Sequence, residues 1–224
     1  VDVFSRHAHT DCVLFDVVQW VDDHHQQRIP LPQFEVMSGY EAFSESLSWA
    51  IHGVYMARRA LYDRYPYDDS CRAYSDDNTT RLHYYISREV RPCGGFYYYR
   101  QHEASVTHKA GLRHFDYLRA NESMRRQLID LGVGDDVLRR YENQRWLVLV
   151  DCWRFYFIHR QRMTPQDRRA ARAEMKRVWK TIDTTTLEPR NKWKLGYMPL
   201  RPSWRLFCLQ EELYFTLKRW LRRL

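Results

Sequence analysis

Two adjacent acids, Asp76 and Asp77, stand in the stretch "YSDDNTT". A carboxylate that is held in a fixed place can take a proton from a hydroxyl group, which is the task of a general base. The same residue types also begin helices, because Asp77 or Asn78 can cap a helix, and an acid in the first turn complements the helix dipole. Taken by itself, the stretch favours the helix cap.

Other reactive side chains form no recognised motif. The pairs His7/His9 and His24/His25 have no cysteine or carboxylate cluster at zinc spacing, so we expect them to be surface histidines. The chain contains 5 cysteines and no C-x-x-C spacing. An odd number of scattered thiols indicates a reducing compartment and buried thiols, with neither a disulfide framework nor a zinc site.

Charge is divided unevenly along the 224 residues, whose net charge is +8. Residues 1–112 hold 11 Lys and Arg against 15 Asp and Glu, a net of −4, whereas residues 113–224 hold 25 against 13, a net of +12. The second half is therefore expected to attract anions such as nucleic acid, anionic lipid or a phosphorylated substrate.

The elements that must position these groups alternate between strands and helices in the first half. β-branched and aromatic residues predict a buried strand over 11–21. "SGYE" at 38–41 is a capping-box pattern that predicts a helix to about Leu47. A short strand and a helix that ends before Pro66 are expected over 49–65.

The acidic pair is followed by a predicted helix over 78–89, whose inner face would carry Leu82, Tyr85 and Ile86. A strand should follow from residue 90, and the glycines at 94 and 95 predict that it breaks there and that 96–100 form a separate strand. The first half is thus expected to be an α/β unit.

The second half has helical periodicity throughout, with helices predicted over 114–131, 135–161, 165–182 and 203–223. Residues 146–158 are almost wholly apolar but span about 13 residues, which is fewer than the roughly 20 that a bilayer requires. Asp151 and Arg154 can pair on one face of this core helix. "TPQD" places Thr164 as the N-cap of the next helix.

The last predicted helix joins an apolar stripe to a basic flank, which is the composition of helices that lie on anionic membranes. The simpler interpretation is a helix packed on its own domain with a solvated basic face. Nucleic acid is the third use of such charge, but the sequence has no zinc finger, basic zipper or complete RNP-like strand, so we do not expect it as a partner. The stripe consists of Leu206, Leu209, Leu213, Leu217, Trp220 and Leu224, and the flank carries Arg205, Lys218, Arg219, Arg222 and Arg223.

The order of several short motifs changes the interpretation of the acidic pair. "DCVLFDV" covers 11–17, "WAIHGVYMARRAL" begins at Trp49, "SDDN" follows at 75–78, and "YYYRQHEASVTH" covers 97–108. This order resembles the second half of bacterial family 2 glycosyltransferases, which have the GT-A fold. The basic tail "RPSWRLFCLQEELYFTLKRWL" resembles the helical C-terminal extension of some members. The likeness extends over nearly the whole chain.

The resemblance implies inverting transfer of a sugar from a nucleotide-sugar to a saccharide or lipid-linked acceptor. Asp77 would match the general base of the family, with Asp76 where glutamate is more usual. Because the helix dipole should lower the pKa of such an acid, the strength of the base would come from its geometry and partners. A divalent metal, Mn²⁺ or Mg²⁺, would neutralise the diphosphate leaving group.

Four further site residues are implied by the same resemblance. Arg100 and His102 would lie near the diphosphate or the metal, with His102 as a candidate ligand, and Ser105 belongs to the same segment. Trp49 would line the acceptor side, although packing in the core is its simpler role. For Arg100 the alternative is an ion pair with an acid such as Glu103, and for His102 a hydrogen bond to backbone.

One departure from the family is large. Neither a "PVYN"-like strand nor a D-x-D metal motif occurs in these residues. We therefore expect a partial GT-A-like α/β unit over 1–112, the acceptor-side half, followed by a basic helical extension over 113–224. These residues alone should transfer no sugar, and no cofactor site is evident in them. The parent enzyme would make surface polysaccharide or glycolipid in the cytoplasm, at the inner face of a bacterial membrane. The alternative is a non-enzymatic basic helical module that binds an anionic membrane or nucleic acid.

Overall fold

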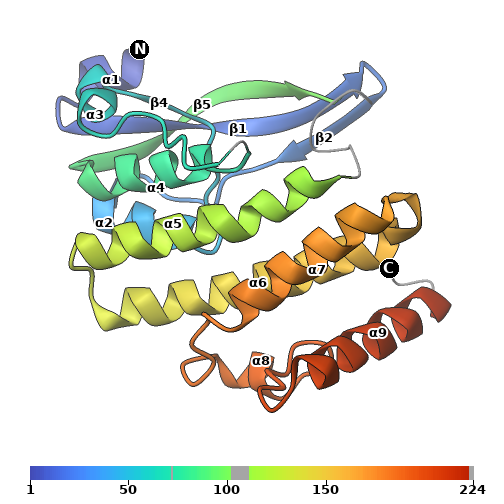
Figure 1. Ribbon diagram of the computed structural model, residues 1–224. Coiled ribbons are helices and arrows are strands. Elements are labelled where there is room, and N and C mark those ends of the chain that lie inside the picture. The colour runs from blue at the N-terminus through green and yellow to red at the C-terminus, as the bar shows by residue number, and fades with distance from the viewer. Residues whose placement is uncertain (72, 102–110, 222–224) are drawn as a thin grey trace. The chain divides into compact units, whose positions relative to one another are not determined.

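The computed structural model describes residues 1–71, 73–101 and 111–221. The chain divides into two compact units, Val1–Lys109 and Ala110–Leu224. The first combines a five-stranded mixed sheet with short helices, and the elements described in the second are all helices (Figure 1). The mixed α/β class predicted for the chain, with helices in its C-terminal part, is confirmed.

The sheet of the first unit is built around strand β1 (Thr10–Asp22), which the sequence predicted. It pairs in parallel with β5 (Glu89–Arg100) and antiparallel with β2 (His25–Ile29) and β4 (Tyr55–Ala57). The short β3 (Met37–Ser38) pairs antiparallel with the start of β5, which gives the strand order β2-β1-β5-β3.

The predicted break at Gly94–Gly95 is wrong, because β5 is one strand. Its register against β1 shifts instead, since Leu14 pairs with Pro92 but Asp16 pairs with Phe96. The extra residues form a bulge, which bends a strand without ending it. Glycine is suited to such an irregularity because it lacks a side chain to pack.

Helices α2 (Gly39–Ser46) and α4 (Asp76–Ile86) pack against each other in the first unit. The capping box predicted for α2 is present, with the Oγ atom of Ser38 accepting from the backbone N–H of Glu41 at 3.2 Å. The closeness of the two helices requires Gly39, because a Cβ there would lie 2.0 Å from the carbonyl oxygen of Ser87. The unit is completed by α1 (Asp2–Arg6) and α3 (Arg59–Arg64), the latter ending before Pro66 as expected.

The second unit is organised around α6 (Asp135–His159), which packs against α5 (Asp116–Asp130), α7 (Pro165–Trp179) and α9 (Trp204–Trp220). Aromatic side chains from three of these helices, among them Trp153, Trp179 and Phe207, fill its core. The predicted Thr164 cap and the Asp151–Arg154 ion pair are both confirmed. Shorter helical segments are η2 (Leu112–Phe115), η3 (Arg160–Arg162) and α8 (Pro189–Lys192).

Candidate functional site

The acidic pair forms the first turn of α4, as the sequence analysis expected of acids in "YSDDNTT". The predicted capping by Asp77 or Asn78 is wrong, because Ser75 occupies the N-cap position. The hydroxyl group of Ser75 donates to the carbonyl oxygens of Asp68, at 2.5 Å, and Cys71, at 3.0 Å. Asp77 is therefore not used as the cap of its own helix.

The loop before α4 is fastened to the helix through Asp68. The amide of Asn78 donates to a carboxylate oxygen of Asp68 at 2.7 Å, and the backbone N–H of Asp68 donates to Thr79 Oγ1 at 2.8 Å. Both Asn78 and Thr79 are fully buried. Paired buried polar groups specify one arrangement of the chain, since an unpaired group would be costly. These bonds fix the place at which α4 begins.

The carboxyl group of Asp77 is largely removed from water. Burial raises its pKa to about 6, against the opposing effect of the Arg81 guanidinium, and the neighbouring Asp76 raises it further. The prediction that the helix dipole lowers this pKa is wrong, because desolvation outweighs the favourable charges. A carboxylate with a pKa near 6 is a stronger base than one in water and is still mostly ionised at pH 7.

Arg81 connects Asp77 to Trp49. It follows Asp77 by one helical turn on α4, and its side chain is only 2% exposed. The guanidinium carbon lies 4.5 Å from the centre of the Trp49 ring, which is a cation–π contact. Trp49 is half-buried and has a positive φ of 60°, a conformation that non-glycine residues rarely adopt. Arg81, which was not selected from the sequence, thus contacts the predicted residue Trp49 and also stabilises the ionised form of the predicted residue Asp77 by its charge.

Further along α4, His83 anchors the helix to the segment before Pro66. Its Nε2 atom lies 2.7 Å from the carbonyl oxygen of Tyr65, and its Nδ1 atom lies 2.6 Å from the hydroxyl oxygen of Tyr55. Because a carbonyl only accepts, Nε2 carries the proton and Nδ1 accepts from the tyrosine. Burial also lowers the pKa of His83, so the ring is neutral and its role is structural.

The other predicted residues lie outside this cluster. Arg100 ends β5, with its guanidinium carbon 5.4 Å from the centre of the Trp20 ring. His102, Ser105 and Glu103 lie outside the described residues, so their predicted roles stay predictions. Of the predicted surface histidines, His9, His24 and His25 are exposed.

The metal that the resemblance implies finds no set of ligands in the part of the chain that the structure describes. Within residues 1–71, 73–101 and 111–221, no group of three or more His, Cys, Asp or Glu side chains could hold a metal ion. Asp76 and Asp77 therefore lack a third protein ligand there. We assign no metal to this cluster and derive no step through one.

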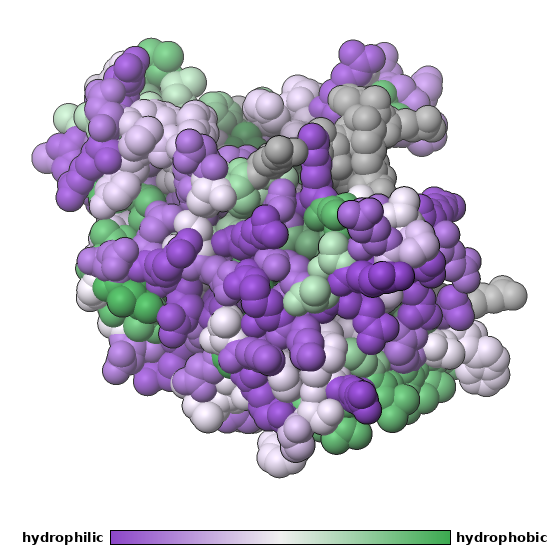
Figure 2. Space-filling view, viewed as in Figure 1, coloured by the Kyte–Doolittle hydropathy of each residue, from purple (hydrophilic) through white to green (hydrophobic). Residues whose placement is uncertain are grey.

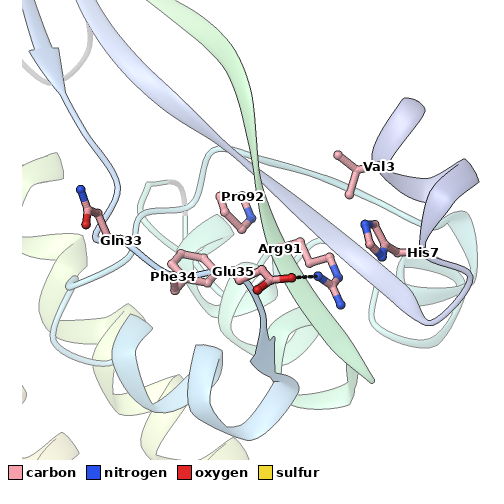
Figure 3. A pocket seen from close by; sticks show the side chains of 7 residues that line it. All are labelled: Val3, His7, Gln33, Phe34, Glu35, Arg91 and Pro92. Carbon is pink, nitrogen blue, oxygen red and sulfur yellow. Dashed lines mark ion pairs between the residues drawn. The ribbon is translucent and has the colours of Figure 1, made fainter.

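A pocket of about 590 Å³ opens elsewhere on the first unit (Figure 3). Its lining comes from α1, the segment before β3, and β5. Arg91 and Glu35 point toward each other across it, with 3.8 Å between Arg91 Nη1 and Glu35 Oε1. None of the candidate residues lines this pocket, so we do not assign it to the chemistry of Asp77. Its lining residues are Val3, His7, Gln33, Phe34, Glu35, Arg91 and Pro92.

Comparison with known proteins identifies no relative of this chain. No family model, no curated protein and no solved structure matches the chain. The likeness to glycosyltransferases consequently rests on the quoted sequence motifs alone.

Proposed function

We propose that the first unit is the acceptor-side half of an inverting glycosyltransferase, in which Asp77 is the general base. The observation that supports this most directly is the state of Asp77. Its carboxyl group is half-buried, its pKa is raised to about 6, and it stands in the first turn of a helix that buried hydrogen bonds hold in place. A group used only to begin a helix requires none of this burial.

The reaction assigns one proton transfer to this chain. Asp77 takes the proton of an acceptor hydroxyl group while that oxygen forms a bond to the anomeric carbon of a nucleotide-sugar. The bond from that carbon to the diphosphate breaks, and the nucleoside diphosphate leaves with the bonding electrons. Attack from the face opposite the leaving group inverts the configuration. The divalent metal that the resemblance implies would supply charge neutralisation at the diphosphate, and we assign none of the described residues to it.

Arg81 and Trp49 have positioning roles in this proposal. The charge of Arg81 favours ionised Asp77 and prevents burial from raising the pKa further. Its contact with the Trp49 ring holds that ring beside the start of α4, where an acceptor sugar would be bound. The proposal places Arg100, His102 and Ser105 toward the diphosphate, as the resemblance implies.

Acceptor binding can be tested with the 224-residue chain. Saturation-transfer NMR against a panel of saccharides should show binding to the wild type and to Asp77→Asn, which keeps the shape of the side chain. Trp49→Ala should weaken the binding, and Trp193→Ala, which changes an exposed tryptophan of the second unit, is the matched control. If no saccharide binds, or if both tryptophan variants lose binding equally, the proposed acceptor site is wrong.

The base itself is tested by transfer. With Mn²⁺, UDP- and GDP-sugars and the saccharides that bind, we expect no turnover from these residues alone, because they lack the D-x-D motif of the family. Observed turnover would overturn that expectation. If turnover does appear, Asp77→Asn should lower kcat by about 100-fold or more, whereas Asp76→Asn should change it much less. Full activity in Asp77→Asn would exclude Asp77 as the base.

A further inference from the structure

Helix α9 carries apolar side chains on two opposite sides, one packed in the core and one exposed. Its buried side includes Phe207 and Phe215 but also two polar residues, Gln210 and Glu211, which is 0% exposed. Its leucines instead point away from the core, with Leu209 65% and Leu213 52% exposed. The predicted stripe is present from Leu206 to Trp220, whereas Leu224 lies outside the described residues, and the core of the second unit does not cover it.

The exposed apolar residues form one continuous sector. Their spacing along α9 is that of one helix face, since residues three, four and seven apart lie in line. Hydrophobic side chains gather along α9 at the lower right of Figure 2. Contiguous exposed patches of this kind indicate an interaction surface. The sector consists of Leu206, Leu209, Leu213, Leu217 and Trp220, of which Trp220 is 79% exposed.

Cationic side chains border this sector on one side. Arg205 and Arg219 project from α9 itself and are exposed. Arg172 of α7 reaches α9 at Cys208, with 3.8 Å between its Nη2 atom and the sulfur. Arg160 forms an ion pair with Glu212 on the same side. An apolar face with an arginine border complements a surface that is apolar below and anionic above.

We propose that this face of α9 binds the surface of a membrane that contains anionic phospholipids. The leucines and Trp220 would enter the boundary between headgroups and acyl chains, and Arg205 and Arg219 would contact lipid phosphates. The helix would lie in the surface. Within the described residues, no helix combines the length and the apolar character that crossing a bilayer requires. The proposal does not depend on the sugar-transfer reaction.

Two other occupants fit the same face less well. A nucleic acid would contact the arginines but would leave the leucines without a partner, since phosphate contacts need no apolar sector. A second copy of the chain would cover the leucines, but it would bring another second half with a net charge of +12 to the same surface. Like charges at an interface oppose association. An anionic lipid surface satisfies both the apolar sector and the charge.

Vesicle co-sedimentation tests the proposal directly. The chain should bind vesicles of phosphatidylcholine mixed with phosphatidylglycerol, bind pure phosphatidylcholine weakly, and lose affinity as salt is raised. The double variant Leu209→Ala/Leu213→Ala should lower the affinity about tenfold or more. The matched control Leu112→Ala/Ile129→Ala, which removes exposed apolar side chains outside α9, should leave it unchanged.

The arginines are tested in the same way. Arg205→Gln/Arg219→Gln should reduce binding to anionic vesicles about tenfold, whereas Arg126→Gln/Arg139→Gln, on α5 and α6, should have a much smaller effect. Circular dichroism would establish that each variant is folded. Equal losses in the α9 variants and their controls, or no binding to anionic vesicles, would overturn the proposal. The proposal would also be overturned if the wild-type chain bound no vesicles and instead formed a dimer that Leu209→Ala/Leu213→Ala dissociates.

Discussion

Helices α4 and α9 both bury polar side chains, but they do so with different consequences. On α4, buried Asn78, Thr79 and His83 have specific partners in the loop that precedes the helix. On α9, one oxygen of buried Glu211 accepts a hydrogen bond from Gln210, and the other has no partner among the described residues. The buried polar side chains of α4 thus fix a candidate site in place. Those of α9 occur instead on a helix whose other face is apolar and exposed.

A polar residue inside a fold is informative only together with its partners. Around α4, the hydrogen bonds fix where the helix begins and therefore where Asp77 stands. Around α9, the core supplies few partners for Glu211, and desolvation raises the pKa of this acid to about 8. Helix α9 therefore has a buried carboxyl group, that of Glu211, which is costly to ionise, and an exposed apolar surface that is unfavourable in water.

The largest expected effect separates the two faces of α9. Phe207→Ala should lower the free energy of unfolding by about 3–5 kcal/mol, because it removes a fully buried ring and leaves a cavity. Leu213→Ala should change it by less than about 0.5 kcal/mol, since that side chain already faces water. Urea denaturation of both variants measures the difference. A large loss in Leu213→Ala would show that the leucine face is covered in solution.

The next effect concerns Glu211 and depends on pH. Its pKa is about 8 in the folded chain and about 4.5 when it is solvated. Between those values the folded state keeps a proton that the unfolded state loses, so stability falls as the pH rises from 4.5 to 8. Glu211→Gln cannot ionise and should be more stable than the wild type above pH 8, by about 2–4 kcal/mol, with no such gain at pH 4.5.

Denaturation at several pH values tests the Glu211 prediction. Glu212→Gln, one residue further along α9, controls for the removal of a carboxylate from the same helix. The slope of stability against pH between 4.5 and 8 should become flatter in Glu211→Gln. Identical slopes in the wild type and Glu211→Gln would contradict the prediction.

The sequence predicted local features of the fold well. The strand β1, the two caps at Ser38 and Thr164, and the end of α3 before Pro66 each depend on residues close together in the chain. Such signals can be recognised from neighbouring residues alone, because a cap or a proline acts within one helical turn. The continuity of β5 was missed because it depends on pairing with β1, about 80 residues earlier in the chain.

The candidate site was predictable in part for the same reason. Periodicity identified the leucine stripe of α9 but could not show whether the core would cover it. The contact between Arg81 and Trp49 joins helix α4 to the turn that follows α2, two segments that the fold brings together. The spacing of Asp77 and Arg81, one turn apart, was the one available signal for the arginine. The raised pKa of Asp77 could not be inferred, because burial depends on what surrounds α4.

The smallest expected effect tests whether local rules apply equally in the two units. Ser38 and Thr164 each accept a backbone N–H bond at the start of a helix, at 3.2 Å on α2 and 3.1 Å on α7. Ser38→Ala and Thr164→Ala should therefore each lower the free energy of unfolding by about 1 kcal/mol. Ser38→Gly and Thr164→Gly should lower it by only about a few tenths of a kcal/mol, since glycine is tolerated at the N-cap. At each position the glycine variant is therefore the control for the alanine variant. Urea denaturation resolves these differences. A negligible cost for Thr164→Ala beside a full cost for Ser38→Ala would mean that the tertiary contacts of α7, rather than its cap, determine where that helix begins.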